Sequence, residues 1–302
     1  MALRVESLAM RRLAVAATVV ALVRPCAAAP PRFFVEGPGR LAIENAHTGE
    51  RAAVVYRRAD GTYDPDALAR LAHVFRSADG RETPIALRLV EVLGRLQALS
   101  GTRPLVLMSG YRSPDYNAAL RAQGRQVAGG SLHTEGLAAD LAFPRRELFG
   151  LWLRVRALGC CGAGYYAREG FLHVDVGRPR FWEAATSRVD ENLSAGNARL
   201  FARTEFDRYG TGEPIAVALH ALTVPPVRVA RTATLLPERG APVSVTLEGD
   251  AGDGCLPADA TGAVFRVPAA PACGRARLVL RTCAPRVERT PETVESNPIE
   301  VR

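Results

Sequence analysis

Apolar residues recur at helical spacing in several segments of the first 160 residues. After Asp64-Pro65 they lie three or four residues apart as far as residue 74, and the same spacing follows Thr83-Pro84 as far as residue 96. A capping residue followed by proline is typical of a helix start. The sequence therefore predicts helices beginning at these two points, a third after Ser113-Pro114, and a fourth over about 145–158.

Other segments have the two-residue period of β-strands, and two of them carry ionisable residues. In 137–143 the odd-numbered positions are apolar, and Asp140 lies on the opposite face between two alanines. In 171–177 the even-numbered positions are apolar, and His173 and Asp175 share the other face. A short buried strand is also predicted over 104–108. A carboxylate inside a sheet needs a partner, and a metal ion is one of the few good ones.

The last hundred residues have a different texture. Short β-rich runs are separated by clusters of Gly, Pro and Asp, which predicts an all-β, sandwich-like C-terminal domain over 198–302. The predicted strands cover 215–222, 243–247, 263–267, 277–281 and 299–302, and the polar segment 184–196 is the candidate linker. This domain could bind the cell wall or a partner, or could be purely structural, and its sequence does not decide between these roles.

The N-terminus has the three parts of a secretory signal. Basic residues at 4, 11 and 12 precede an apolar stretch over 13–23, and alanines follow at 27–29. We expect a signal peptide over 1–29, export to the periplasm or cell envelope, and no stable membrane span after cleavage. The alternative is an uncleaved anchor.

Charge and cysteine content fit an exported protein. All 39 basic residues are arginine, and the formal net charge of +8 favours an anionic polymer such as nucleic acid or cell wall. The export signal selects the wall and argues against nucleic acid. One disulfide is predicted among Cys255, Cys273 and Cys283. Cys160 and Cys161 are adjacent, which disfavours an ordinary disulfide between them.

Three residues could form a metal centre. Two histidines and one carboxylate, His133, Asp140 and His173, would leave one position of a tetrahedral zinc site open for catalysis. The alternative is that they are unrelated polar residues on strands.

These residues belong to motifs that resemble a known family. Ser131-x-His133-x-x-Gly136-x-Ala138-x-Asp140 is similar to the motif of the D-alanyl-D-alanine zinc peptidase family, which includes the VanY-type carboxypeptidases. Further matches are Ser109-Gly110-Tyr111-Arg112-Ser113, Gly164-Tyr165-Tyr166 and His173-Val174-Asp175-Val176-Gly177, and they look closest to the murein endopeptidase K branch. The resemblance covers roughly residues 38–183. It implies an α+β, hedgehog-like catalytic domain, here placed at 30–190.

The resemblance also implies roles for the site residues. His133, Asp140 and His173 would bind Zn²⁺, and Arg112 would hold a substrate carboxylate or stabilise the oxyanion, unless it forms a structural ion pair. Ser131 would bind substrate or order its loop. Many family members have an acid three residues before the last histidine ligand, and this chain has Gly170 there. Asp175 is then the first candidate for the general base and Glu169 the second, although Asp175 could instead orient His173.

The predicted function is zinc-dependent hydrolysis of peptide bonds in peptidoglycan stems, as a murein endopeptidase acting on cross-links. A D-alanyl-D-alanine carboxypeptidase is the first alternative, since sequence does not show whether the substrate groove is closed at one end. A non-catalytic, zinc-containing wall-binding module is the second, because the expected acid is missing at Gly170.

Overall fold

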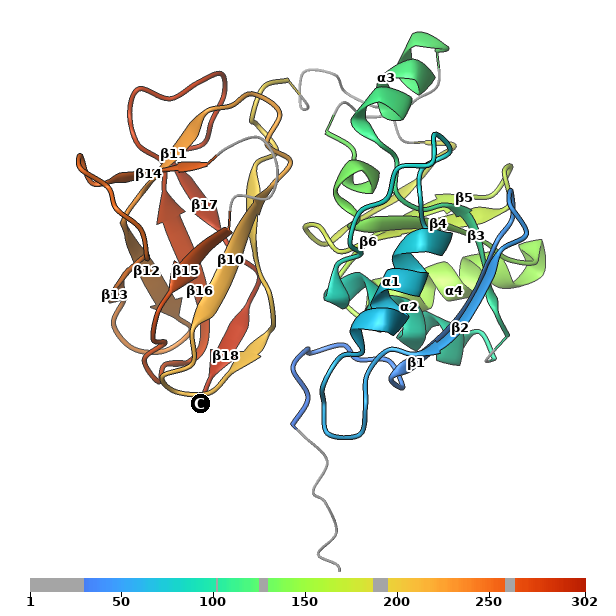
Figure 1. The fold of residues 1–302 in the computed structure, drawn as a ribbon, viewed down its shortest axis with the longest axis horizontal. Coiled ribbons are helices and arrows are strands. Elements are labelled where there is room, and N and C mark those ends of the chain that lie inside the picture. Colours follow the sequence, from blue (N-terminus) through green and yellow to red (C-terminus); the bar gives the residue numbers. More distant parts are fainter. Residues whose placement is uncertain (1–29, 102, 125–129, 187–194, 259–263) are drawn as a thin grey trace, which may run out of the picture.

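The computed structural model describes residues 30–302 apart from 102, 125–129, 187–194 and 259–263 (Figure 1). The predicted signal peptide and most of the predicted linker lie outside these residues. Buried apolar side chains form two clusters, one built mainly from residues 41–176 and the other from residues 200–301. Within the described part of the chain, no helix has both the length and the apolar character needed to cross a bilayer. The structure is thus a mixed α/β half followed by a β-rich half.

A seven-stranded sheet forms the centre of the first half, in the order β2-β1-β3-β4-β6-β5-β7. The strands β4 and β6, which carry the ionisable residues, lie in the middle of this sheet, where both neighbours fix their positions. Only the β1/β3 and β5/β7 pairs are parallel. The strands are β1 (Arg40–Asn45), β2 (Arg51–Val55), β3 (Leu105–Ser109), β4 (Ala138–Ala142), β5 (Gly162–Tyr166), β6 (Phe171–Asp175) and β7 (Arg180–Glu183).

The helices of this half follow the predicted pattern with one difference. They are α1 (Pro65–Val74), α2 (Leu87–Leu99), α3 (Pro114–Ala122) and α4 (Arg145–Ala157), with a short 3-10 helix η1 (Leu132–Glu135). Asp64 and Ser113 cap α1 and α3 as expected. The predicted start of α2 near Pro84 is wrong by three residues. The Ala86 N–H donates to the Gly136 carbonyl, so this segment runs along the loop before β4 before it becomes helical.

The second half contains only strands among its described residues. All five predicted runs contain a strand, while β8, β9, β11, β12, β14 and β17 were not foreseen. The strands are β8 (Phe201–Thr204), β9 (Arg208–Tyr209), β10 (Ile215–His220), β11 (Val227–Ala230), β12 (Thr232–Pro237), β13 (Val243–Thr246), β14 (Cys255–Ala258), β15 (Val264–Val267), β16 (Gly274–Arg281), β17 (Thr293–Glu295) and β18 (Ile299–Val301). They form sheets of six, three and two strands around the second cluster.

Two disulfides lie in the part of the chain that the structure describes. Cys255 and Cys283 are bonded, as one of the predicted pairings, and Cys273 is free. The expectation against a Cys160–Cys161 bond is wrong, because these neighbours are joined, with their Cα atoms 3.7 Å apart. The chain bends at both residues between α4 and β5, and this bend lets the two side chains meet.

Candidate metal centre

The sheet register brings Asp140 and His173 together. Strands β4 and β6 pair antiparallel with Asp140 directly opposite His173. Directly opposed residues of such a pair point to the same face with Cβ atoms about 4.5–5.5 Å apart. The alternation predicted for both strands is therefore enough to place one acid beside one imidazole.

His133 reaches the same point from η1. This short helix ends at Gly136, whose φ of 67° is left-handed and turns the chain into β4. A Cβ at Gly136 would also lie 2.5 Å from the Pro84 carbonyl oxygen, so a glycine is needed for close approach as well. His133 is buried, and its Nδ1 lies 2.7 Å from the carbonyl oxygen of Gly110. If Nδ1 carries the proton, Nε2 is left as a free donor atom.

Three donor atoms converge at distances that suit a tetrahedral metal. Nδ1 of His173 lies 2.8 Å from Oδ1 of Asp140 and 3.3 Å from Nε2 of His133, which is 3.4 Å from the same Oδ1. Zinc with ligands at about 2.0–2.1 Å separates neighbouring donors by about 3.3 Å. Within the described chain, this His-Asp-His set is the group whose ligand atoms all lie within 4.8 Å of one another. The residues present therefore fit a zinc ion.

The electrostatics of the cluster also favour a cation. Burial, helped by the nearby charges of Arg112 and His173, lowers the pKa of His133 although Asp140 acts in the opposite direction. Burial opposes charge on His173 too, but hydrogen bonds to Asp140 and Asp175 outweigh it and raise the pKa of His173 to about 9. The two histidines in turn hold the pKa of Asp140 below its usual value despite burial. Two carboxylates thus surround a position that requires positive charge, from a proton or a metal.

Asp175 is enclosed on every side. It is fully buried, and its Oδ2 lies 3.0 Å from Nε2 of His173. The Gly177 N–H donates to Oδ1 at 2.8 Å, and the Arg180 guanidinium lies within 3.0 Å of both oxygens. A Cβ at Gly162 would come within 2.2 Å of Oδ2. Asp175 therefore contacts the side of His173 that faces away from the other two donors.

The remaining predicted residues lie at different distances from this centre. Arg112 donates from Nη2 to Oδ2 of Asp140 at 2.8 Å and from Nε to Ser109 Oγ at 2.9 Å. Ser131 is buried before η1, and its carbonyl oxygen accepts hydrogen bonds from Thr134. Glu169 lies exposed in the turn between β5 and β6, and among the described residues no hydrogen bond or ion pair joins it to the cluster.

Sequence reasoning missed two residues on β7, Arg180 and Trp182. Arg180 pairs with Asp175, and the Trp182 ring lies 5.2 Å from the His173 ring and donates from Nε1 to the Tyr166 hydroxyl at 3.2 Å. Gly164 makes room for this indole, since a Cβ there would meet Trp182 at 2.5 Å. Arg180 and Trp182 lie two residues apart on a short strand, so they share one face of it. This two-residue spacing is the sequence signal that indicates them.

Comparison with known proteins identifies the family. A family model described as peptidoglycan L,D-endopeptidase MepK matches residues 35–182. The peptidoglycan L,D-endopeptidase MepK of Escherichia coli strain K12 is 38% identical over 147 residues, which is 48% of this chain and 80% of that protein. The probable MepK of Haemophilus influenzae is 31% identical over 149 residues, with the same coverage. The chain belongs to this family.

Family membership confirms the motif resemblance. MepK proteins form a branch of the D-alanyl-D-alanine peptidases, which are metallopeptidases, so the chain is a member of an enzyme family. The matched segment contains all seven predicted site residues and ends within β7. The β-rich half after residue 198 lies outside the match.

Proposed function

We propose that this protein is an exported zinc peptidase that hydrolyses peptide bonds in peptidoglycan, as an endopeptidase acting on cross-links between peptide stems. The convergence of His133 Nε2, Asp140 Oδ1 and His173 Nδ1 carries the proposal. Relatives named as peptidoglycan L,D-endopeptidases support the substrate and the bond class. The net charge of +8 suits an anionic wall.

These three side chains would hold the zinc ion, and Arg112 would keep Asp140 in place. When bound, zinc supplies a Lewis acid that polarises the scissile carbonyl and activates water. Arg112 neutralises Oδ2 of Asp140, so Oδ1 stays directed at the two histidines. This contact supports the ion-pair role for Arg112 over direct binding of substrate.

Asp175 acts on His173 in this proposal and is not the general base. A carboxylate that accepts from the second ring nitrogen of a histidine ligand fixes its tautomer and raises its basicity. Both oxygens of Asp175 already face donors from His173, Gly177 or Arg180. A base needs an oxygen within hydrogen-bond reach of the attacking water.

Replacing Asp175 with asparagine is therefore expected to weaken zinc binding about 10- to 100-fold while leaving residual activity at saturating zinc. Zinc affinity would be measured by competition with a chromophoric chelator, and turnover at several zinc concentrations. If Asp175 is the base instead, zinc affinity stays normal and turnover is lost at every zinc concentration.

Finer features of the architecture belong to the same proposal. We place the catalytic domain at 30–190 and a β-sandwich-like domain at 198–302, because the two hydrophobic clusters divide near these bounds. A hedgehog-like topology of the first half follows from the family resemblance. A signal peptide over 1–29 and a periplasmic or envelope location accord with a wall substrate.

The test is digestion of purified peptidoglycan by the mature protein with zinc, followed by mass analysis of the fragments. We expect cross-linked stems to be converted to uncross-linked ones, chelation to abolish this, and added zinc to restore it. Loss of terminal D-alanine alone would replace the proposal with a carboxypeptidase. Intact peptidoglycan after treatment with zinc-loaded protein would refute the enzymatic proposal in favour of a wall-binding module.

A further inference from the structure

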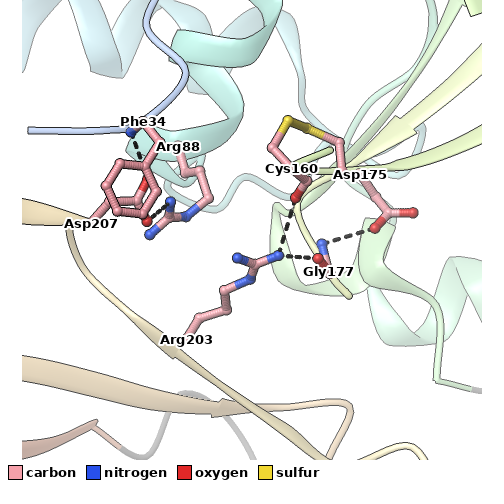
Figure 2. The surroundings of a disulfide bond; sticks show 8 residues. Phe34, Arg88, Cys160, Asp175, Gly177, Arg203 and Asp207 are labelled. Atoms are coloured by element: carbon pink, nitrogen blue, oxygen red, sulfur yellow. Dashed lines mark hydrogen bonds and ion pairs between the residues drawn. A yellow bond between two sulfur atoms is a disulfide. The ribbon is translucent and has the colours of Figure 1, made fainter. Parts of the chain in front are cut away.

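A side chain of the β-rich half contacts the two chain segments that flank Asp175. Arg203 on β8 donates from Nη2 to the carbonyl oxygen of Gly177 and lies 3.5 Å from that of Cys160 (Figure 2). Both carbonyls belong to the first half. Arg203 is partly buried, and no acid among the described residues lies within ion-pair distance of it. Its hydrogen bonds across the two halves are thus made to main-chain oxygens.

The two segments that Arg203 joins are those that enclose Asp175. Gly177 follows Asp175 by two residues, and its N–H donates to Oδ1. Cys160 precedes Gly162 by two residues, and Gly162 is paired with Asp175 across β5 and β6. A chain of contacts therefore runs from Arg203 through Gly177 and Asp175 to Nε2 of His173.

Arg203 is itself held firmly in position. It lies opposite Ala218 in the pairing of β8 with β10. The next residue, Thr204, has its carbonyl bound by Arg88 of α2 at 3.1 Å, and Arg88 also pairs with Asp207 (Figure 2). Burial and the nearby Arg88 charge lower the pKa of Arg203. Burying a guanidinium costs free energy unless it is hydrogen-bonded, and the partners of Arg203 in the first half are carbonyls next to Asp175.

We propose that Arg203 is a positioning residue for the metal centre, and that the β-rich half thereby completes a site whose ligands all lie in the first half. By fixing the Gly177 and Cys160 carbonyls, Arg203 holds in place the two segments that surround Asp175, residues 160–162 and 175–177, which we call the Asp175 pocket. These segments keep Asp175 against His173. The inference rests on the proposed zinc site. It assigns a function to a half that lies outside the family match.

The test compares zinc affinities of the full mature chain by chelator competition, without peptidoglycan. Arg203→Ala is expected to weaken zinc binding about 10-fold, the lower end of the effect of removing an outer partner of a ligand. Arg203→Lys should recover part of this loss, because one ammonium can still donate to Gly177. The matched control is Arg32→Ala, which removes the contact of Arg32 with Glu213 across the same two halves but touches none of the Asp175 pocket. It should bind zinc normally.

A double-variant cycle decides whether the effect passes through Asp175. In an Asp175→Asn background, Arg203→Ala is expected to have little further effect on zinc affinity. Wild-type affinity in Arg203→Ala, or an undiminished loss in the Asp175→Asn background, would overturn the proposal. If Arg203→Ala does not fold, Arg203→Lys is taken through the same cycle. Because zinc affinity is measured without peptidoglycan, the result for Arg203 can be interpreted even if the protein proves not to cleave peptidoglycan.

Discussion

Replacing Asp140 with asparagine is expected to remove both zinc binding and peptidoglycan hydrolysis, with turnover falling by about 10³-fold or more, or roughly 4 kcal/mol of transition-state stabilisation. Asparagine has nearly the same shape, so β4 should keep its pairing with β6. It supplies no negative charge to hold a cation beside His133 and His173. Arg112, which now pairs with Oδ2, would add uncompensated positive charge at the same point.

Metal content by elemental analysis and fragment release from peptidoglycan are the two measurements. Asp250→Asn is the matched control, because Asp250 is an exposed residue of the β-rich half and the same charge is removed there. This control should retain one zinc per chain and full turnover. An Asp140→Asn protein that keeps stoichiometric zinc and cleaves cross-links at the wild-type rate would show that the metal lies elsewhere.

The part of this site that the sequence could predict rests on strand parity. Alternation of apolar residues is enough to put Asp140 and His173 on defined faces, because side chains of a strand alternate strictly. Parity says nothing about which strands are neighbours, and the direct opposition of these two residues comes from the register of β4 and β6. His133 lies on a short 3-10 helix without such a period, so only the motif resemblance indicated its role.

Other features depend on contacts between distant segments. Arg203 lies 26 residues beyond Gly177, in a part of the chain with no family match, and nothing local marks it as a neighbour of the site. The late start of α2 depends on a hydrogen bond from Ala86 to Gly136, fifty residues further on. The Cys160–Cys161 bond depends on the bend between α4 and β5. These three features arise from tertiary contacts, and local sequence propensities do not predict such contacts.

Replacing Asp207 with alanine is expected to lower the free energy of unfolding by about 3–5 kcal/mol. Asp207 is buried and accepts hydrogen bonds from Arg88 and from the Phe34 N–H at 2.9 Å (Figure 2). It also accepts one from the Asn297 side chain at 2.9 Å. It therefore joins α2, the N-terminal segment and the β-rich half. Alanine would leave the buried Arg88 guanidinium without its carboxylate and the Phe34 N–H without this acceptor, while Asn297 Nδ2 would keep only its bond to the Pro298 carbonyl.

Urea unfolding followed by tryptophan fluorescence reports specifically on the unfolding of the first half. Both tryptophans, Trp152 and Trp182, lie in the first half, whereas Asp207 lies in the second. A lower midpoint in this signal would mean that the contact between the halves stabilises the metal-binding half. The matched control is Asp253→Ala, whose carboxylate pairs with Arg228 at the exposed surface, where solvent screens the pair, so the midpoint should stay close to that of the wild type.

A second variant separates the ion pair from the packing around it. Changing Arg88 to Met together with Asp207 to Leu removes both charges and keeps apolar volume, so it should cost less than Asp207→Ala alone, since the penalty for a buried unpaired guanidinium disappears. Equal losses in the two variants would mean that the lost hydrogen bonds from Asn297 and Phe34 to Asp207 dominate the effect. No loss in either, by tryptophan fluorescence, would mean that the Arg88–Asp207 contact does not stabilise the first half.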